Sequence, residues 1–154
     1  MPEYINDTIA AISTPRGRGG IAIIRVSGPD AFKLAEKYLK LKKPIENLRS
    51  RTAYRSAFYN NAELVDDVMF TLFRAPKSYT GEDILEISCH GNDFIAVQIL
   101  EALLQDARLA NPGEFTSRAF LNNKMDLTRA EAIGNLLMAQ TQKAQKASLM
   151  QIEG

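Results

Sequence analysis

Short apolar runs alternate with turn-forming segments along much of the chain. Four of these runs are rich in branched or aromatic residues and are bounded by Gly, Pro or Asn, a pattern that predicts β-strands. The predicted strands are Ile21–Ser27, Thr52–Tyr59, Val65–Phe73 and the run around Glu86. Asn60-Asn61 lies between the second and third of them, so these two strands are expected to form an antiparallel hairpin.

Apolar residues at helical spacing predict helices between and after these strands. The predicted helices begin after Gly28-Pro29-Asp30, at Phe94, at Asn111-Pro112 and at the capping box Thr128-Arg129-Ala130-Glu131. The second is apolar nearly all round and is expected to be buried, and the third is expected to start at Pro112 and end near Leu121. The last continues to Gly154 without a stop signal, so it is expected to be cut short or to pack on a partner chain. The elements together predict an α+β fold with a mixed or antiparallel sheet flanked by helices.

Two charged residues lie in the middle of predicted strands. Arg25 lies in Ile21–Ser27, and Glu86 lies in an apolar run that ends near Cys89. A charge in such a position is costly to bury unless it has a partner. Two interpretations follow: Arg25 and Glu86 form an ion pair across the sheet, or both reach into a pocket where a carboxylate and a guanidinium can each bind a polar ring bidentately. The sequence leaves both open.

Composition narrows the classes of function. The chain has 154 residues, 45% of them hydrophobic, and a formal net charge of +1. This charge gives no general attraction to nucleic acid or to anionic membranes, so RNA contact would need a local patch. The sequence has a single cysteine, no apolar run long enough to span a bilayer and no signal pattern, and we therefore expect a cytoplasmic protein without membrane contact.

Other candidate motifs are weak. Gly17–Ala22 matches G-x-G-x-x-A, but a strand follows where the dinucleotide fingerprint requires a helix, and no G-x-x-x-x-G-K-[ST] motif is present. Cys89 shares a strand face with the core positions, so it is expected to be a buried thiol, and His90 points to the other side. The lysines at 37, 40, 42 and 43 are expected to form a solvated surface rather than an RNA footprint.

Three longer blocks of the sequence are more informative about the protein family than these short motifs. They are Thr14–Gly28, then Ser78–Asp83 with Glu86 and His90-Gly91, then Asn111–Thr116 with Arg118–Leu127. Together they resemble the amino-terminal region of the MnmE (TrmE) family of tRNA-modification GTPases. The match extends from about Asp7 to the last predicted helix.

The resemblance implies a domain similar to the folate-binding domains of one-carbon enzymes, which holds a tetrahydrofolate and mediates homodimerisation. The folate-contacting arginine, glutamate and lysine of the family fall on Arg25, Glu86 and Lys124. By this resemblance Glu86 would hold the pterin edge, and Arg25 and Lys124 would fix the remaining polar groups. The ligand would be a 5,10-methylene or 5-formyl tetrahydrofolate.

The resemblance also implies a larger assembly. The full protein, with a flavin-dependent partner, would use the folate carbon in a 5-carboxymethylaminomethyl-type modification of the wobble uridine of tRNA. GTP, Mg²⁺ and K⁺ would belong to a GTPase domain that these residues lack, as they lack the family's carboxy-terminal cysteine motif.

Residues 1–121 would then form the folate-binding and dimerisation domain, and residues 122–154 the first helix of a truncated helical domain. No catalytic or metal-binding residue is expected in this chain, which alone should not hydrolyse GTP. Asn92 departs from the family pattern, which usually has a second glycine there.

Three alternatives remain. The first is a non-catalytic dimerisation or assembly module in which Arg25 and Glu86 only pair with each other. The second is a stand-alone RNA-binding domain, which the net charge disfavours. The third is a thiol-dependent hydrolase, which the expected burial of Cys89 disfavours.

Overall fold

The protein folds around one mixed six-stranded sheet, seen in a computed structural model that describes residues 6–14 and 20–122. The strand order is β3-β4-β5-β2-β1-β6. Neighbouring strands are antiparallel, except that the short β6 runs parallel to β1. The strands are β1 (Ile9–Ile12), β2 (Ile21–Ser27), β3 (Ala53–Asn60), β4 (Glu63–Phe73), β5 (Ile84–His90) and β6 (Arg108–Leu109).

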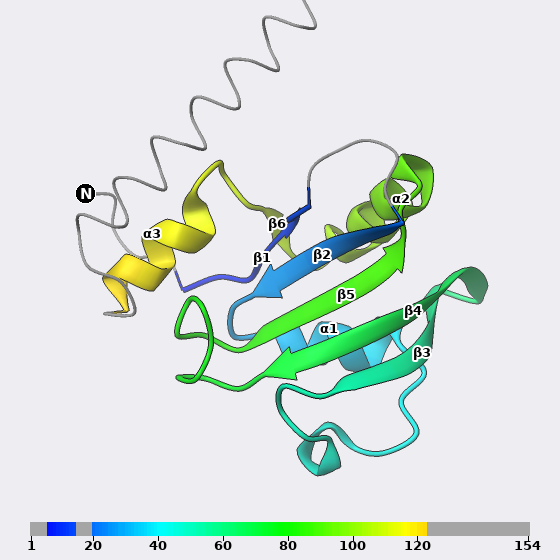
Figure 1. The fold of residues 1–154 in the computed structure, drawn as a ribbon, viewed down its shortest axis with the longest axis horizontal. Helices are drawn as coiled ribbons and strands as arrows, with labels where there is room; N and C mark the ends of the chain where they lie inside the picture. Colours follow the sequence, from blue (N-terminus) through cyan, green and yellow to red (C-terminus); the bar gives the residue numbers. More distant parts are fainter. Residues whose placement is uncertain (1–5, 15–19, 123–154) are drawn as a thin grey trace, which may run out of the picture.

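Helices α1 (Ala31–Tyr38) and α2 (Asp93–Leu103) cover one face of this sheet and lie behind it in Figure 1. Helix α3 (Glu114–Leu121) lies at one side, beside the loop that precedes β5. A short 3₁₀ helix, Ile45–Asn47, interrupts the connection from α1 to β3. The predicted α+β fold is therefore confirmed. Among the described residues, no helix has the length and apolar character needed to cross a bilayer.

The core lies between the sheet and the helices α1 and α2. Alternate residues of the strands point into it, because successive side chains of a strand project to opposite faces. The largest buried members include Ile24, Val26, Phe58, Leu72, Leu85, Ile87, Ile99 and Leu103. Cys89 belongs to this set and is 4% exposed, and burial raises the pKa of its thiol to about 11. The expected buried thiol is confirmed.

Two expectations about the helices are wrong in detail. Helix α3 begins at Glu114 rather than at Pro112, because Gly113 adopts a left-handed conformation with φ of 75° directly before it. The amide of Asn111 still donates to the side chain of Glu114 at 2.9 Å, as the amide of a capping residue does. Helix α2 is buried along one face only, at Ala96, Ile99, Ala102 and Leu103, and Phe94 in its first turn is 69% exposed. The predicted end of α3 at Leu121 and the predicted hairpin between β3 and β4 are confirmed.

The opposite face of the sheet, here called the open face, carries no helix over its centre. Arg25 of β2, Glu86 and Ser88 of β5 and Thr71 of β4 lie on it in neighbouring register positions. All four are partly exposed. Two of the three sequence-predicted site residues, Arg25 and Glu86, therefore lie on this polar surface.

Candidate functional site

Arg25 and Glu86 lie directly opposite each other on β2 and β5. The Nε of Arg25 donates to Oε1 of Glu86 at 3.1 Å, and the two side chains are 24% and 25% exposed. The structure therefore brings the two predicted residues together as an ion pair, which is the first of the two interpretations left open by the sequence. The contact uses one guanidinium nitrogen and one carboxylate oxygen. Within the described part of the chain, the terminal nitrogens of Arg25 and Oε2 of Glu86 make no hydrogen bond.

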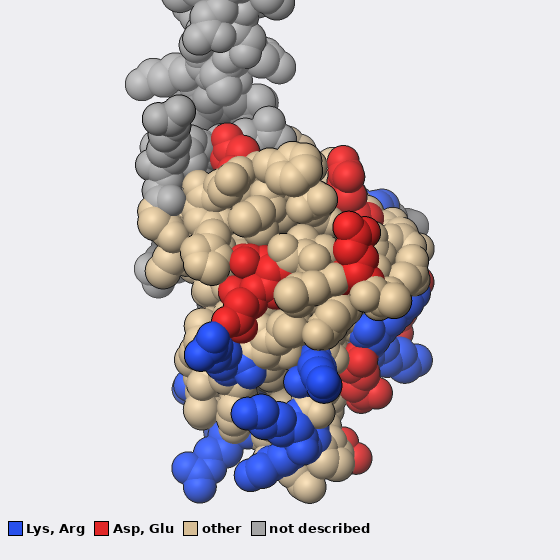
Figure 2. Space-filling view, turned by 90° about the vertical axis from the view of Figure 1, so that its right-hand side faces the viewer, with Lys and Arg blue, Asp and Glu red and all other residues tan. Residues whose placement is uncertain are grey.

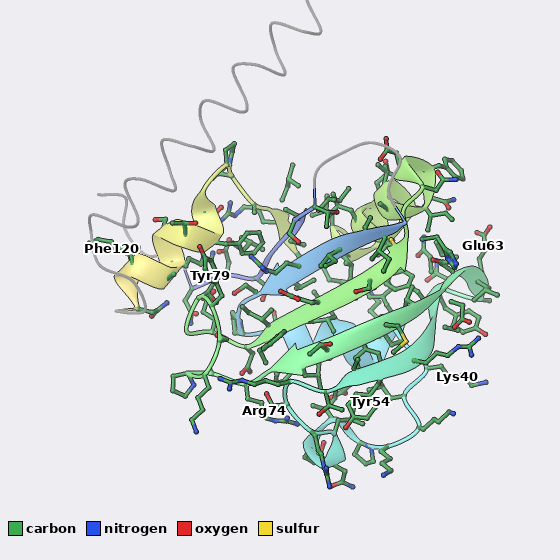
Figure 3. All side chains as sticks on the ribbon, in the orientation of Figure 1. Lys40, Tyr54, Glu63, Arg74, Tyr79 and Phe120 are labelled. Atoms are coloured by element: carbon green, nitrogen blue, oxygen red, sulfur yellow. The ribbon has the colours of Figure 1, made fainter. Side chains whose placement is uncertain are left out.

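Two aromatic rings flank the same guanidinium. The Cζ atom of Arg25 lies 5.2 Å from the ring centroid of Tyr79 and 5.4 Å from that of Phe115. These distances are typical of cation–π contacts. Tyr79 comes from the loop before β5 (Figure 3), and Phe115 comes from α3. The Tyr79 hydroxyl is 2.9 Å from the hydroxyl of Thr116, which also belongs to α3. The Arg25 guanidinium therefore contacts two aromatic side chains that come from outside the sheet.

Lys124, the third predicted site residue, lies outside the described residues. Asn122, two positions earlier, is described and bonds to the loop before β5 through its side chain, 2.9 Å from the carbonyl of Thr80.

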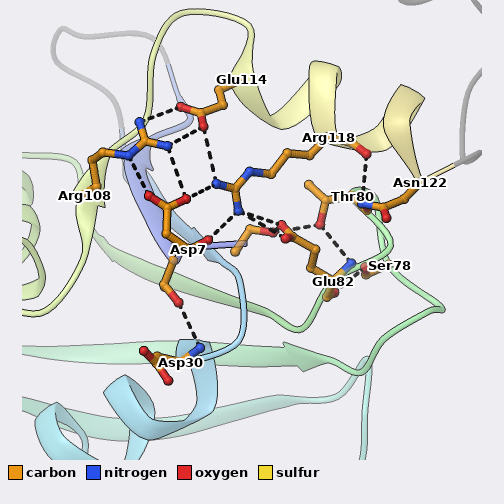
Figure 4. A network of polar contacts seen from close by, with 11 residues as sticks. Asp7, Asp30, Ser78, Thr80, Glu82, Arg108, Glu114, Arg118 and Asn122 are labelled. Carbon is orange, nitrogen blue, oxygen red and sulfur yellow. Dashed lines mark hydrogen bonds and ion pairs between the residues drawn. The ribbon is translucent and has the colours of Figure 1, made fainter. Parts of the chain in front are cut away.

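A second set of charged residues forms a network beside α3 (Figure 4). Arg118 is its centre and is 3% exposed. Its guanidinium donates to both oxygens of Glu82 at 3.1 Å, to the carbonyl of Asp7 at 2.6 Å and to the Asp7 carboxylate. Glu114, one turn earlier on α3, is also in contact with it at 3.4 Å. Arg108 of β6 completes the set by bonding both Asp7 and Glu114, and we call these five residues the Arg118 network.

Electrostatics in this network favour the ionised carboxylates. Hydrogen bonds from Arg108 and Arg118 hold the pKa of Asp7 below its usual value. Burial alone would raise the pKa of Glu114, but hydrogen bonds from Arg108 and from the amide of Asn111 outweigh it, so this pKa is lowered as well. No buried side-chain nitrogen or oxygen in the described ranges lacks a hydrogen-bond partner. The two buried members of the network, Arg118 and Glu82, are thus hydrogen-bonded, and satisfied buried polar groups favour one fixed arrangement.

The Arg118 network depends on a close approach of the amino-terminal segment to the turn after β2. Gly28 has φ of 141°, and a Cβ atom there would lie 2.6 Å from the Asp7 carbonyl oxygen and from Thr8 Cα. Only glycine fits such a position. Thr8 then accepts a hydrogen bond from the amide of Asp30 at 2.8 Å, which fixes the segment that carries Asp7.

The other candidates have structural partners. His90 Nδ1 lies 2.9 Å from Asp66 on the neighbouring strand β4, and the His90 amide donates to the same carboxylate. His90 therefore has a hydrogen-bonded structural role, and as expected it lies on the opposite face of the strand from the buried Cys89. Among the described residues, no group of three or more His, Cys, Asp or Glu side chains could hold a metal ion.

The four lysines of the predicted cluster have different surroundings. Lys37 bonds Asp106 at 2.6 Å, whereas Lys40, Lys42 and Lys43 are exposed around a surface hollow that Glu36 and Glu46 also line. Figure 2 shows basic side chains at the lower end of the molecule and acidic ones above them, on the side where Lys40 projects in Figure 3. Mixed signs around the hollow fit a solvated surface better than a phosphate-binding surface.

The Arg118 network and the two rings over Arg25 were not found from the sequence. Asp7, Glu82 and Glu114 lie beside polar residues or turn-forming Gly and Pro, and Arg118 lies in a short amphipathic segment. A charge in such places is ordinarily solvated, so nothing local marks these residues as buried. The available signal was the density of charged residues inside the second and third sequence blocks, without any account of what they contact.

The family model and the similar proteins point to the same family. The family model described as GTP-binding protein TrmE N-terminus matches residues 8–124. A tRNA modification GTPase MnmE of Francisella philomiragia is 47% identical over 98% of the chain. Proteins of the same name from Thermotoga maritima and Parabacteroides distasonis are 46% and 47% identical, each over 96% of the chain. The chain spans about a third of the length of these relatives, between 32% and 33%.

Proposed function

Because this chain belongs to the family of TrmE amino-terminal domains, we propose that it binds a reduced folate at the Arg25–Glu86 pair. The bound folate would be the one-carbon donor of a tRNA-modification GTPase. The observation that carries this proposal is the incomplete pairing of two charges on the open face, under two aromatic rings. A carboxylate and a guanidinium that each keep free hydrogen-bonding atoms can bind a ligand without first breaking their own contact.

The chemistry of the site suits an amino-pyrimidinone ring. Glu86 would accept hydrogen bonds from the ring's amino and N–H groups through Oε2 and, by sharing, Oε1. The terminal nitrogens of Arg25 would donate to a carbonyl or carboxylate of the same ligand. Tyr79 and Phe115 provide apolar surface beside these polar groups. Lys124 remains a proposed third contact. The 5,10-methylene or 5-formyl form of tetrahydrofolate supplies the one-carbon unit when it is bound.

The relatives carry the name tRNA modification GTPase, and on this basis we extend the proposal to the whole protein. This region would form homodimers and act with a flavin-dependent partner on the wobble uridine of tRNA, at carbon 5, in the cytoplasm. GTP hydrolysis, with its Mg²⁺ and K⁺, would reside in the part of the relatives' length that the chain does not span.

Isothermal titration with 5-formyltetrahydrofolate tests the folate proposal directly. A saturable heat signal at micromolar to millimolar ligand is expected. No detectable binding at millimolar ligand, by a chain that circular dichroism shows to be folded and sedimentation shows to be dimeric, would refute it.

The rival function is an assembly module without its own ligand. The direct Arg25–Glu86 hydrogen bond is the observation that favours it. Arg25→Ala and Glu86→Ala, made separately, distinguish the two functions. Large losses in the free energy of unfolding with unchanged folate affinity would support the assembly module, whereas lost folate affinity in a stable protein supports the folate site.

A further inference from the structure

We infer that Arg118 is a positioning residue for the proposed folate site, because the Arg118 network holds both aromatic rings that flank Arg25. This inference rests on the proposed function and adds a residue that neither the burial pattern of the strands nor the mid-strand charges identify. Arg118 itself does not contact Arg25 or Glu86 through any hydrogen bond described above. Its action would pass through the loop before β5 and through α3.

The first connection runs through Glu82 to the loop that carries Tyr79. Glu82 is 9% exposed, accepts from Arg118 and also accepts from the Ser27 hydroxyl at 2.8 Å. The Ser27 hydroxyl lies 2.7 Å from the Thr80 hydroxyl. The Thr80 hydroxyl also accepts a hydrogen bond from the backbone amide of Glu82, at 3.2 Å. Thr80, which follows Tyr79, is thus hydrogen-bonded to Ser27 at the end of β2. Glu82 connects this group to Arg118.

The second connection runs along α3. Arg118 and Glu114 belong to this helix, and Phe115 and Thr116 lie between them. Anchoring Arg118 to Glu82 and Asp7 therefore sets the position of α3 against the sheet, and with it the Phe115 ring. Thr116 then joins the two connections, since its hydroxyl is 2.9 Å from that of Tyr79.

The geometry of arginine is what this arrangement requires. One guanidinium contacts acceptors from three segments of chain: the amino-terminal segment at Asp7, the loop before β5 at Glu82 and its own helix at Glu114. A lysine keeps the positive charge, but it places its donors on a single nitrogen and cannot reproduce the planar fork. Arg118→Lys should therefore preserve the charge balance of the network while loosening the placement of Tyr79 and Phe115 over Arg25.

The experiment compares Arg118→Lys with Arg55→Lys. Arg55 forms an exposed ion pair with Asp67 on neighbouring strands of the same sheet, so its replacement makes the same chemical change away from the rings. Two readouts are used: the dissociation constant for 5-formyltetrahydrofolate by calorimetry, and the NMR signal of the Arg25 Nε–H group. This proton is bonded to Glu86 and lies near two rings, so its chemical shift reports ring placement without any ligand.

For Arg118→Lys we expect the dissociation constant to rise about tenfold and the Arg25 Nε–H signal to shift or broaden, with neither change in Arg55→Lys. A folded Arg118→Lys protein with the wild-type dissociation constant and the wild-type Arg25 signal would overturn the inference. If Arg118→Lys does not fold, Glu82→Gln is measured in its place, because it keeps the size of the side chain and removes the charge that pairs with Arg118. The Arg25 signal should then shift or broaden, and an unchanged signal would overturn the inference. If the wild-type chain binds no folate, the folate proposal fails, while the Arg25 signal still tests the positioning role.

Discussion

Arg25 and Glu86 are 61 positions apart in the sequence, yet they meet at a single 3.1 Å hydrogen bond across β2 and β5. Each side chain is about three-quarters buried. This degree of burial is enough to strengthen a polar interaction, and it still leaves both groups accessible from the open face. The pair thus satisfies the physical need of a mid-strand charge for a partner without enclosing that charge.

Replacing Glu86 by Ala should weaken reduced-folate binding by about 1.5–3 kcal/mol, since a charged hydrogen bond to the ligand would be lost. Calorimetric titration measures the change. Glu63→Ala is the matched control, because Glu63 is an exposed carboxylate at the far end of the β3–β4 hairpin, and folate affinity should stay at the wild-type value (Figure 3). Equal affinities for the Glu86→Ala and wild-type proteins would contradict a folate contact at this residue.

Replacing Glu82 by Ala should lower the free energy of unfolding by about 3–5 kcal/mol, because Arg118 would lose a buried ionic partner. Urea unfolding followed by circular dichroism measures this loss. Asp67→Ala removes the carboxylate of an exposed arginine pair and should leave the urea midpoint nearly unchanged. Similar midpoints for the two variants would show that the Arg118 network does not act as a buried ionic cluster.

The Cys89 thiol should resist alkylation in the folded protein. It is 4% exposed, and its pKa is raised to about 11 by burial, so little thiolate is present at pH 8. Labelling with iodoacetamide at pH 8 should be slower than in 6 M guanidinium chloride by a factor on the order of a hundred. Rapid labelling of the folded protein would instead indicate a reactive thiol and would revive the hydrolase alternative.

Sequence reasoning predicted what depends on local pattern. The strands β2 to β5 were found because branched residues alternate or run together, whereas the short strands β1 and β6 were not predicted. The α1 face was found because Ala31, Leu34, Ala35 and Tyr38, all buried, recur at helical spacing. The meeting of Arg25 and Glu86 could be proposed because an isolated charge in an apolar strand needs a partner. Contacts that join separate segments could not be predicted in this way.

The start of α3 and the Arg118 network illustrate that limit. Asn111-Pro112 carries the residue types of a helix start, and the Glu114 side chain does accept from the Asn111 amide as in a capping box. Gly113, however, is left-handed, so the helix begins only at Glu114. The burial of Arg118 and Glu82 arises only when the amino-terminal segment, the loop before β5 and α3 converge. Their sequence neighbours, such as Ser117 and Gly81, are polar or small and give no sign of an enclosed position.

Acid should destabilise the protein through Asp7 and Glu114. The folded-state pKa of each carboxyl lies below its ordinary value of 3.8 or 4.5, so the native state favours the ionised form. The stability that each contributes is therefore complete above its ordinary pKa and is lost as the pH falls through the lower folded-state pKa. Urea midpoints measured from pH 6 down to pH 2.5 should decline below about pH 4.5. In Asp7→Asn the residue at position 7 no longer titrates, so this variant should be less stable at pH 6 and should decline less steeply. Parallel curves for the two proteins would contradict a role for the ionised Asp7 in the stability of the Arg118 network.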